Sequence, residues 1–435
     1  MWEMRNLFYY SSAGEIRGYM KIALIHPPHP NSTDDRLDPP LGLLYIAAHL
    51  RFHGYEVDII DLSGLQSLDM PFADIYGITA YISSIGITRQ IITRCREINP
   101  IAKVIVGGAH ATACPQDFPE ADHVVIGYGE EAMLQIIDNE RENKIIIGSE
   151  PRDLFIFPAY DLINISTYHR RVADRPSLPY ITSRGCPFKC AFCGLAKMHE
   201  FGFGVRMATP DTVISHIKRI KDQFGIDRIN FQDDIFTFNP KRLFHILDML
   251  IPLNIKFRCH GRAGYDTEET YERLAAAGCD QVAWGIESGS QHILNRMRKQ
   301  VTVQDNYNVI QWAKRCSITS RAFLIIGFPG ETAETIEDTK HFIEWADPDQ
   351  CFVSNFIPYP GTDVGDNPSK YGITDISGDY DQYYQVSKDG TGGVTIDTEW
   401  LTKYQFRELE LKFRDWLKDR PMRGHLLDYE IKLAK

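Results

Sequence analysis

The sequence predicts an α/β protein: an amino-terminal Rossmann-like, doubly wound parallel sheet, then a partial (βα)6 barrel, then a small helical and loop extension. Two observations predict this class. Short apolar runs alternate with amphipathic stretches along most of the chain, as in parallel sheets covered by helices. A proline-containing segment, residues 150–177, interrupts the alternation once. The length of 435 residues is enough for two or three domains.

The first domain is predicted to span residues 20–149, after an amino-terminal extension of residues 1–19. Apolar runs predict its strands at Lys21–His26, Tyr55–Asp61, Ala73–Thr79, Lys103–Val106 and His123–Ile126. Helical spacing predicts helices over Leu41–Phe52, Ile87–Ile98 and Glu130–Asn139. The carboxyl ends of parallel strands share one edge of the sheet, which is where such sheets bind ligands.

Residues 150–177 are predicted to be a linker, residues 178–360 a barrel, and residues 361–435 an extension that shapes the substrate pocket or caps the barrel. The barrel strands are expected at Tyr180–Ser183, Arg228–Phe231, Lys256–His260, Gln281–Ile286, Ala322–Ile326 and Cys351–Phe356. Helices are expected over Pro210–Gln223, Pro240–Leu250, Glu268–Ala277, Val303–Arg315 and Ala333–Trp345. In the extension, Gly378–Asp397 is expected to be a loop and Glu399–Lys418 a helix.

The net charge and the distribution of apolar residues indicate which partners and which cell compartment to expect. Asp and Glu number 58 against 47 Lys and Arg, a net charge of −11, which disfavours nucleic acid and anionic membrane as partners. No run of about 18 apolar residues predicts a membrane span, and the first twenty residues do not resemble a secretory signal. We therefore expect a cytoplasmic protein, where thiols stay reduced.

Three of the nine cysteines, Cys186, Cys190 and Cys193, lie within eight residues, directly after a predicted strand. At this spacing their thiolates can converge on one metal centre. A structural zinc site requires four ligands, and His199 is a conceivable fourth. Three thiolates on a cubane iron–sulfur cluster would leave one iron open to a cofactor or substrate. Zinc and buried free thiols remain the alternatives.

This segment resembles the CxxxCxxC signature of the radical SAM superfamily, with Phe192 at the aromatic position before the last cysteine. The resemblance implies a radical SAM barrel with a 4Fe-4S cluster on the three cysteines. It also implies S-adenosylmethionine (SAM) bound at the open iron and split to a 5′-deoxyadenosyl radical. Later strand ends match further family motifs, and the residues expected to bind SAM are Phe192, Gln232, Asp233, Arg262, Glu287, Ser288 and Gly327. The motif Phe231-Gln232-Asp233-Asp234 would face the methionyl amine. Arg262 would face the carboxylate, Glu287 the ribose and Gly327 the adenine.

Small and polar residues follow several strands of the first domain, which lacks the GxGxxG fingerprint of dinucleotide sites. These loops resemble the cobalamin-binding domain fused to many radical SAM enzymes. The chain has no DxHxxG motif for a lower histidine ligand to cobalt. The expected cobalamin contacts are Pro27, Thr79, Ala80, Tyr81, Ile82, Ser83, Gly107, Gly108, His110, Gly127, Gly129 and Glu130.

Together the resemblances imply a cobalamin-dependent radical SAM enzyme that methylates an unactivated carbon through the 5′-deoxyadenosyl radical and methylcobalamin. Its expected partners are a small-molecule or peptide substrate and an electron donor such as flavodoxin or ferredoxin. A radical cyclase or rearrangement enzyme without methyl transfer is the alternative. A methylthiotransferase is disfavoured because the first domain offers only Cys95 and Cys114 for a second cluster. A non-catalytic, metal-stabilised binding protein is the remaining alternative.

Overall fold

The computed structural model describes residues 20–29, 32, 34–65, 67–139, 143–151, 155–386, 390–418 and 420. The chain divides into two compact units. Unit 1 comprises residues 1–29 and 40–167, and unit 2 comprises residues 30–39 and 168–435. The predicted extension of residues 1–19 lies outside the described residues. Residues 30–39, which the sequence assigned to the first domain, group with the second unit.

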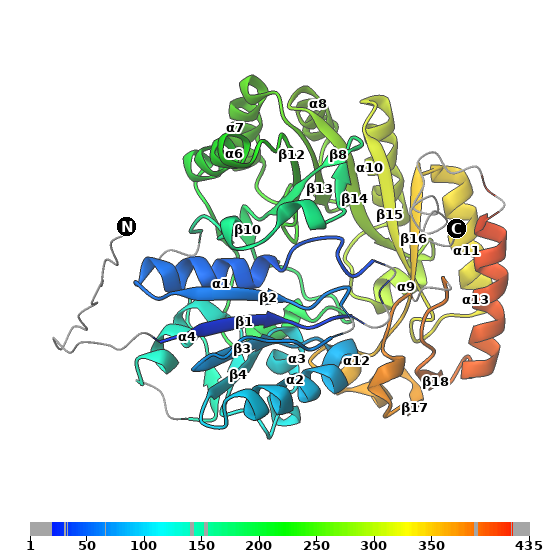
Figure 1. Ribbon diagram of the computed structural model, residues 1–435. Helices are drawn as coiled ribbons and strands as arrows, with labels where there is room; N and C mark the ends of the chain where they lie inside the picture. Colours follow the sequence, from blue (N-terminus) through cyan, green and yellow to red (C-terminus); the bar gives the residue numbers. More distant parts are fainter. Residues whose placement is uncertain are drawn as a thin grey trace. The chain divides into compact units, whose positions relative to one another are not determined.

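Unit 1 contains a parallel sheet with strand order β2-β1-β3-β4-β5-β6 (Figure 1). The strands are β1 Ile22–His26, β2 Val57–Asp61, β3 Ile75–Thr79, β4 Lys103–Gly107, β5 His123–Ile126 and β6 Ile145–Ile147. The five predicted strands are present. The sixth, β6, was missed because three residues are too few to show a periodicity.

Helices cover both faces of this sheet because alternate strand residues enter two separate cores. Ile22 and Leu24 of β1 belong to one core, and Ala23 and Ile25 belong to the other. Helices α1 and α4 pack in the first core, and α2 and α3 pack in the second. These helices are α1 Leu41–Phe52, α2 Ile85–Ile98, α3 Ala109–Ala113 and α4 Gly129–Ile137. The arrangement is doubly wound, as predicted.

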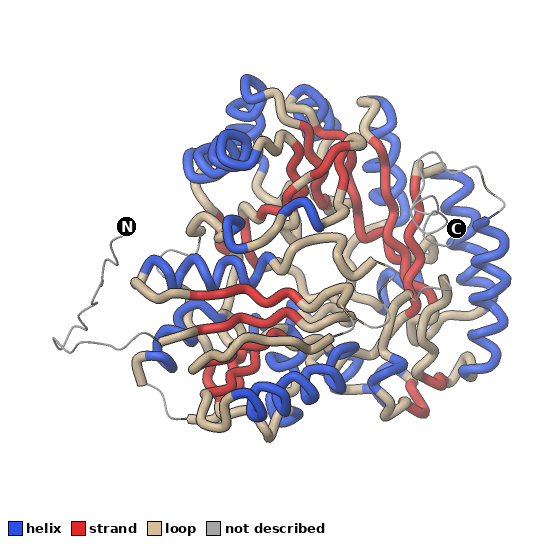
Figure 2. The backbone as a smooth tube through the Cα atoms, in the orientation of Figure 1, coloured by secondary structure: helices blue, strands red, loops and turns tan. Residues whose placement is uncertain are grey.

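Unit 2 contains a second parallel sheet, with strand order β16-β15-β14-β13-β12-β9 (Figure 2). The strands are β9 Leu178–Tyr180, β12 Arg228–Phe231, β13 Lys256–Gly261, β14 Cys279–Glu287, β15 Thr319–Ile326 and β16 Gln350–Asn355. Within the described residues the edge strands β9 and β16 each pair on one side only. The sheet is therefore an open, partial barrel of six strands.

The barrel helices begin and end where the local sequence predicts. In α6, the Thr209 side chain accepts a hydrogen bond from the Thr212 N–H, Pro210 opens the helix, and Gly225 ends it at φ +67°. The main helices are α6 Pro210–Phe224, α7 Pro240–Leu250, α8 Glu268–Ala276, α10 Val303–Arg315 and α11 Ala333–Ala346. Two shorter helices, α5 Leu195–Glu200 and α9 Gln291–Arg296, were not predicted.

The extension contains a two-stranded antiparallel ribbon and a long helix. Its elements are α12 Asp363–Asp366, β17 Ile373–Ile376, β18 Ile396–Thr398 and α13 Lys403–Lys418. The helix begins four residues later than predicted, because the Thr398 hydroxyl accepts N–H bonds from Trp400 and Leu401 and closes a turn there. Two further antiparallel ribbons, both very short, pair β7 Arg171–Val172 with β8 Arg175–Pro176 and β10 Ser183–Arg184 with β11 Arg206–Met207.

Candidate active site

The three clustered cysteines lie in the loop between β10 and α5, and all three are free thiols. Cys190 is 6% exposed, and the other two are half-buried. Burial, followed by the neighbouring Cys190 and Cys186 thiols, raises the pKa of Cys193 to about 11. The three thiols are thus close enough in space for the charge of one to affect the pKa of another. A metal that binds them as thiolates would remove this mutual repulsion.

The loop fits an iron–sulfur cluster better than a single zinc ion. Within the described residues, these three thiols do not form a group whose ligand atoms all lie within 4.8 Å of one another. Zn–S bonds of about 2.3 Å would hold thiolates closer than that. The conceivable fourth ligand, His199, instead has its Nε2 atom 2.7 Å from the Cys186 carbonyl oxygen. A cubane cluster binds each cysteine at a separate iron and accommodates the wider spacing.

The acidic pair after β12 holds the chain that enters this loop. The Asp233 carboxylate is buried and accepts hydrogen bonds from Thr182 N–H, from Thr182 Oγ1 at 2.6 Å and from Ser183 Oγ at 2.5 Å. Its pKa is raised by burial, against these hydrogen bonds. Asp234 accepts the Gly185 N–H at 2.9 Å, directly before the first cysteine. The neighbouring Gln232 donates its N–H to the Tyr180 carbonyl.

The ends of β13 and β14 and the segment after α9 bring three charged side chains next to the loop. The Arg262 guanidinium lies 3.6 Å over the Phe188 ring, and its Nη1 is 3.9 Å from the Cys190 sulfur. Glu287 and Lys299 form a buried ion pair of 2.6 Å, with side chains 8% and 9% exposed. Arg262 also donates to the Lys299 carbonyl. A guanidinium thus lies beside the cysteines, and a carboxylate is linked to it through Lys299. Such groups can bind a carboxylate and hydroxyl groups, respectively.

Glu287 occupies a backbone conformation that few side chains adopt, with φ +63°. Such a conformation persists when its surroundings enforce it, and it occurs often at binding sites. Phe192 of the loop also approaches this group, since Lys299 Nζ lies 5.9 Å from the centre of its ring. Sequence reasoning missed Lys299, because it follows Arg296, Met297 and Arg298 in an ordinary charged stretch.

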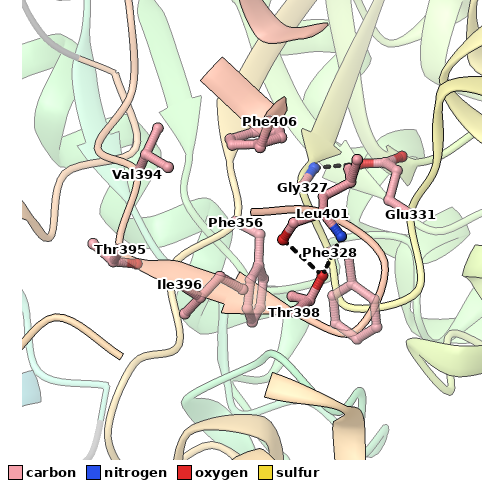
Figure 3. Close-up of a pocket in the computed structure, with 10 residues that line it drawn as sticks. All are labelled: Gly327, Phe328, Glu331, Phe356, Val394, Thr395, Ile396, Thr398, Leu401 and Phe406. Atoms are coloured by element: carbon pink, nitrogen blue, oxygen red, sulfur yellow. Dashed lines mark hydrogen bonds between the residues drawn. The ribbon is translucent and has the colours of Figure 1, made fainter. Parts of the chain in front are cut away.

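Two further predicted SAM contacts have other neighbours in the structure. The buried Ser288 hydroxyl lies 3.3 Å from the Thr339 hydroxyl of α11. Gly327 has φ +82°, and a Cβ there would lie 2.6 Å from Phe406 of α13. Gly327 lines a small cavity of about 10 Å³, room for at most one water, together with Glu331 and Phe406 (Figure 3). This side of Gly327 is therefore occupied by the extension.

The predicted cobalamin residues lie at the carboxyl edge of the unit 1 sheet. Gly108 has φ +98°, and a Cβ there would lie 2.9 Å from the Ala80 backbone nitrogen and oxygen. Ala80 in turn donates its N–H to Gly107 and accepts the His110 N–H. Thr79 ends β3, and Ile82–Ser84, which includes Ser83, is a short 3-10 turn. The backbone of Ala80 therefore packs directly against Gly108, which only a glycine permits.

Other residues of that edge are also placed by packing. The centre of the Tyr81 ring lies 4.7 Å from that of His29 and 6.0 Å from that of His26. Pro27 directly follows His26 in the chain. A Cβ at Gly129 would lie 2.7 Å from Ile46 of α1, so this glycine permits close helix packing.

Thr112 accepts the Gly127 N–H at 3.0 Å. Glu130 is buried at the start of α4.

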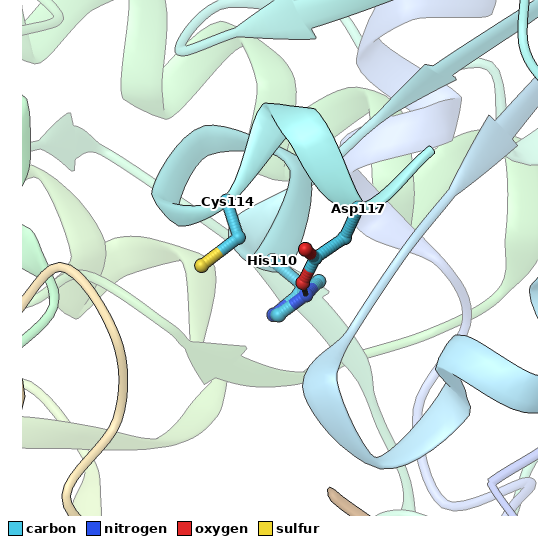
Figure 4. A group of neighbouring side chains, drawn as sticks. All are labelled: His110, Cys114 and Asp117. Atoms are coloured by element: carbon cyan, nitrogen blue, oxygen red, sulfur yellow. Dashed lines mark hydrogen bonds and ion pairs between the residues drawn. The ribbon is translucent and has the colours of Figure 1, made fainter. Parts of the chain in front are cut away.

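His110 points into the domain rather than out of the edge. Its Nε2 lies 2.8 Å from the Asp117 carboxylate (Figure 4). Its ring packs edge-on against Phe118. Burial lowers its pKa, against the effect of Asp117. Cys114 completes a group whose ligand atoms lie within 4.8 Å of one another. The aspartate hydrogen bond and the ring packing account for this arrangement.

Both units match known families. The B12 binding domain profile matches residues 38–137, and the Radical SAM superfamily profile matches residues 180–343. An uncharacterised methyltransferase of Pyrococcus horikoshii is 32% identical over 383 residues, which cover 79% of this chain and 82% of that protein. The chain belongs to the B12-binding group of the radical SAM superfamily.

This radical SAM enzyme is also similar to a cyclase in sequence and to a methyltransferase in structure. The anaerobic magnesium-protoporphyrin IX monomethyl ester cyclase of Rubrivivax gelatinosus is 27% identical over 389 residues, covering 79% of this chain and 69% of the cyclase. The radical SAM methyltransferase TsrM of Kitasatospora setae, solved with cobalamin and a 4Fe-4S cluster, has a TM-score of 0.63 and 17% identity. That match covers 82% of this chain and 79% of TsrM and shows a shared fold.

The matches confirm the predicted fold class, the enzyme class and the three cofactors: a 4Fe-4S cluster, SAM and cobalamin. The roles of the individual residues stay predictions. In the part of the chain that the structure describes, no helix of this radical SAM enzyme is long and apolar enough to span a membrane.

Proposed function

We propose that the enzyme transfers a methyl group from SAM to an unactivated carbon of a small-molecule substrate. The observation that carries the proposal is the loop of Cys186, Cys190 and Cys193 beside Arg262 and the Glu287–Lys299 pair, in a chain that also has a B12-binding domain. The similarity to a protein named methyltransferase supports it. When bound, the cluster and cobalamin would supply one-electron cleavage of SAM and methyl transfer, respectively.

The chain's own residues would bind and orient these groups. We assign the three cysteines as cluster ligands, Arg262 to the SAM carboxylate and Glu287 to the ribose hydroxyls. Lys299 would hold the Glu287 carboxylate in place through the 2.6 Å ion pair. Asp233 would keep the cysteine loop at the end of β9 through its bonds to Thr182 and Ser183.

The test is anaerobic purification with hydroxocobalamin, followed by an absorption spectrum and a product assay. Reconstituted protein is expected to hold about four irons per chain and to bind the corrinoid. With SAM, a reductant and a cell extract that supplies the substrate, it should yield both S-adenosylhomocysteine and 5′-deoxyadenosine. Reconstituted protein that forms no 5′-deoxyadenosine would overturn the proposal.

Cyclisation or rearrangement without methyl transfer is the second candidate, favoured by the similarity to the Rubrivivax cyclase. The two separate when SAM carries a deuterated methyl group. Methylation adds the labelled methyl to the product and forms S-adenosylhomocysteine, whereas cyclisation does neither. We further propose a flavodoxin or ferredoxin as the electron donor and the cytoplasm as the compartment, in keeping with reduced thiols at the cluster loop.

A further inference from the structure

A layer of cationic side chains lies on one face of the unit 2 sheet. It is near the chain that enters the cysteine loop, since His260 Nδ1 is 3.3 Å from the carbonyl oxygen of Asp233. On β14, Trp284 donates its indole N–H to Tyr271 of α8, so Trp284 faces the helices. Its neighbour Ala283 must face the other side, since successive strand residues alternate. Ala283 pairs in register with His260 of β13 and with Arg321 of β15. We call the side that Ala283 faces the inner face.

Arg258 lies two residues before His260 on β13 and therefore also belongs to the inner face. Arg321 stacks over two rings, 5.1 Å from the centre of Phe323 and 5.7 Å from that of Phe352. Arg170 approaches the same region, because its charge and that of Arg258 influence each other. Three guanidinium groups thus gather near His260, whose pKa falls to about 4 through burial and then through Arg258, so that its imidazole is neutral.

Among the groups that influence Arg258, the one carboxylate is that of Asp38, and it is already engaged. Asp38 accepts hydrogen bonds from Arg170 Nε at 3.0 Å and Nη2 at 2.6 Å. Asp38 also accepts the Asn230 amide at 3.3 Å. This carboxylate neutralises Arg170 and leaves the charge of Arg258 without a direct counterion.

Arg258 is 7% exposed, and its Nε has no hydrogen-bond partner. Among the described residues, no carboxylate lies within ion-pair distance of its guanidinium. Its register partner on β12, Asn230, is 2% exposed and has an Oδ1 without a partner. A buried guanidinium is unfavourable unless it is paired, and an anionic ligand would supply the missing partner. The unpartnered donor and acceptor lie on adjacent strands of the same face.

We propose that Arg258, with Arg321 and Asn230, binds a phosphate-type oxyanion carried by the substrate. The proposal rests on the proposed function, since it describes the substrate of that reaction. A guanidinium fork matches the oxygen atoms of phosphate or phosphonate in bidentate fashion. Asn230 Oδ1 would accept a hydrogen bond from a hydroxyl of the same ligand. The substrate would thus be anchored by its anionic end on the inner face of the barrel.

The experiment measures thermal unfolding of the full-length, cluster-reconstituted protein with inorganic phosphate and with chloride at equal ionic strength. Phosphate at about 100 times its Kd is expected to raise the Tm of the wild type by on the order of 5 °C. In Arg258→Met this shift is expected to vanish, while the Tm without phosphate stays equal or rises, because an uncompensated charge has been removed. Arg321→Gln should reduce the shift.

Arg273→Met is the control, because Arg273 is an exposed residue of α8 that pairs with Asp248 and Glu269. It should keep the full phosphate shift. Equal shifts in the wild type and Arg258→Met, or no shift in the wild type, would overturn the proposal. A lower Tm of Arg258→Met without phosphate would show that the arginine is structural and would also overturn it.

Two further arms identify the source of the oxyanion. A shift with acetate but not with phosphate would assign a carboxylate site and refute the phosphate class. Loss of the phosphate shift when hydroxocobalamin saturates the protein would assign the phosphodiester of the cofactor rather than the substrate. Neither measurement depends on turnover. Failure of the oxyanion site is therefore distinguishable from failure of methylation, which is read from S-adenosylhomocysteine and 5′-deoxyadenosine.

Discussion

Replacing Glu331 by glutamine should change how the stability of the enzyme depends on pH. The side chain is 1% exposed, at the turn after β15 (Figure 3). One carboxyl oxygen accepts the N–H groups of Gly327 and Phe328, and the other, Oε1, has no partner. Burial raises the pKa of this carboxyl from 4.5 to about 8, in spite of the two backbone hydrogen bonds.

The sign follows from proton binding. Between pH 4.5 and about 8 the folded protein holds a proton on Glu331 that the unfolded chain has released. The free energy of unfolding therefore falls as the pH rises through this window and levels off above it. The slope is at most about 1.4 kcal/mol per pH unit, so the wild type should lose about 2 to 3 kcal/mol from this group between pH 6 and pH 8. Glu331→Gln has no proton to lose and should keep that stability.

The assay is anaerobic thermal unfolding at pH 6 and pH 8 of the wild type, Glu331→Gln and Glu334→Gln. Glu334 is an exposed acid in the first turn of α11 and serves as the matched control. At roughly 2 °C or slightly less per kcal/mol for a unit of this size, the wild type should lose about 3 to 5 °C more than Glu331→Gln between the two pH values. If Glu331→Gln and the wild type lose the same amount, Glu331 is ionised in the folded enzyme and the reasoning is wrong.

Three further predictions concern the cofactor sites. Cys193→Ser should lose the cluster absorption and the formation of 5′-deoxyadenosine; full iron content in this variant would contradict the ligand assignment. Lys299→Met should destabilise the enzyme to urea by about 3 to 5 kcal/mol, because Glu287 stays buried without its partner, and the double variant with Glu287→Gln should recover part of the loss. Gly108→Ala should abolish hydroxocobalamin binding, measured by absorbance after gel filtration, because its Cβ would lie 2.9 Å from backbone atoms. Gly86→Ala on α2, where a Cβ would meet no atom within 4 Å, should bind normally, and equal binding by both variants would argue against a cobalamin site at this loop.

The sequence predicted the two sheets because their strands are buried on both faces or alternate strictly. The β1 residues 22–26 are all buried, so the strand is a continuous apolar run that needs no knowledge of its neighbours. The cysteine loop was also predictable, since its three thiols lie within eight residues. Proximity along the chain was enough to expect convergence in space.

Contacts between distant segments could not be predicted in this way. Lys299 lies 12 residues after Glu287, and nothing in the stretch around it indicates a buried ion pair. Asp38 lies 132 residues before Arg170, yet the two pair within unit 2. The predicted first domain therefore included residues 30–39, which contribute a carboxylate to the second unit. A single sequence holds no signal that links such positions.

Strand β13 marks the boundary between these two cases. Its sequence KFRCHG alternates, and Phe257 and Cys259 are fully buried, so the pattern predicts which residues face the helices. The same pattern places Arg258 and His260 on the opposite face, where a charge could equally be solvated or paired. Only the structure shows that Arg258 is buried while the nearby carboxylate, Asp38, is committed to Arg170. The burial of Arg258 without a counterion depends on the neighbouring strands and on Asp38. The proposed role of this face in anchoring the substrate could therefore be inferred from the fold but not from the sequence of β13.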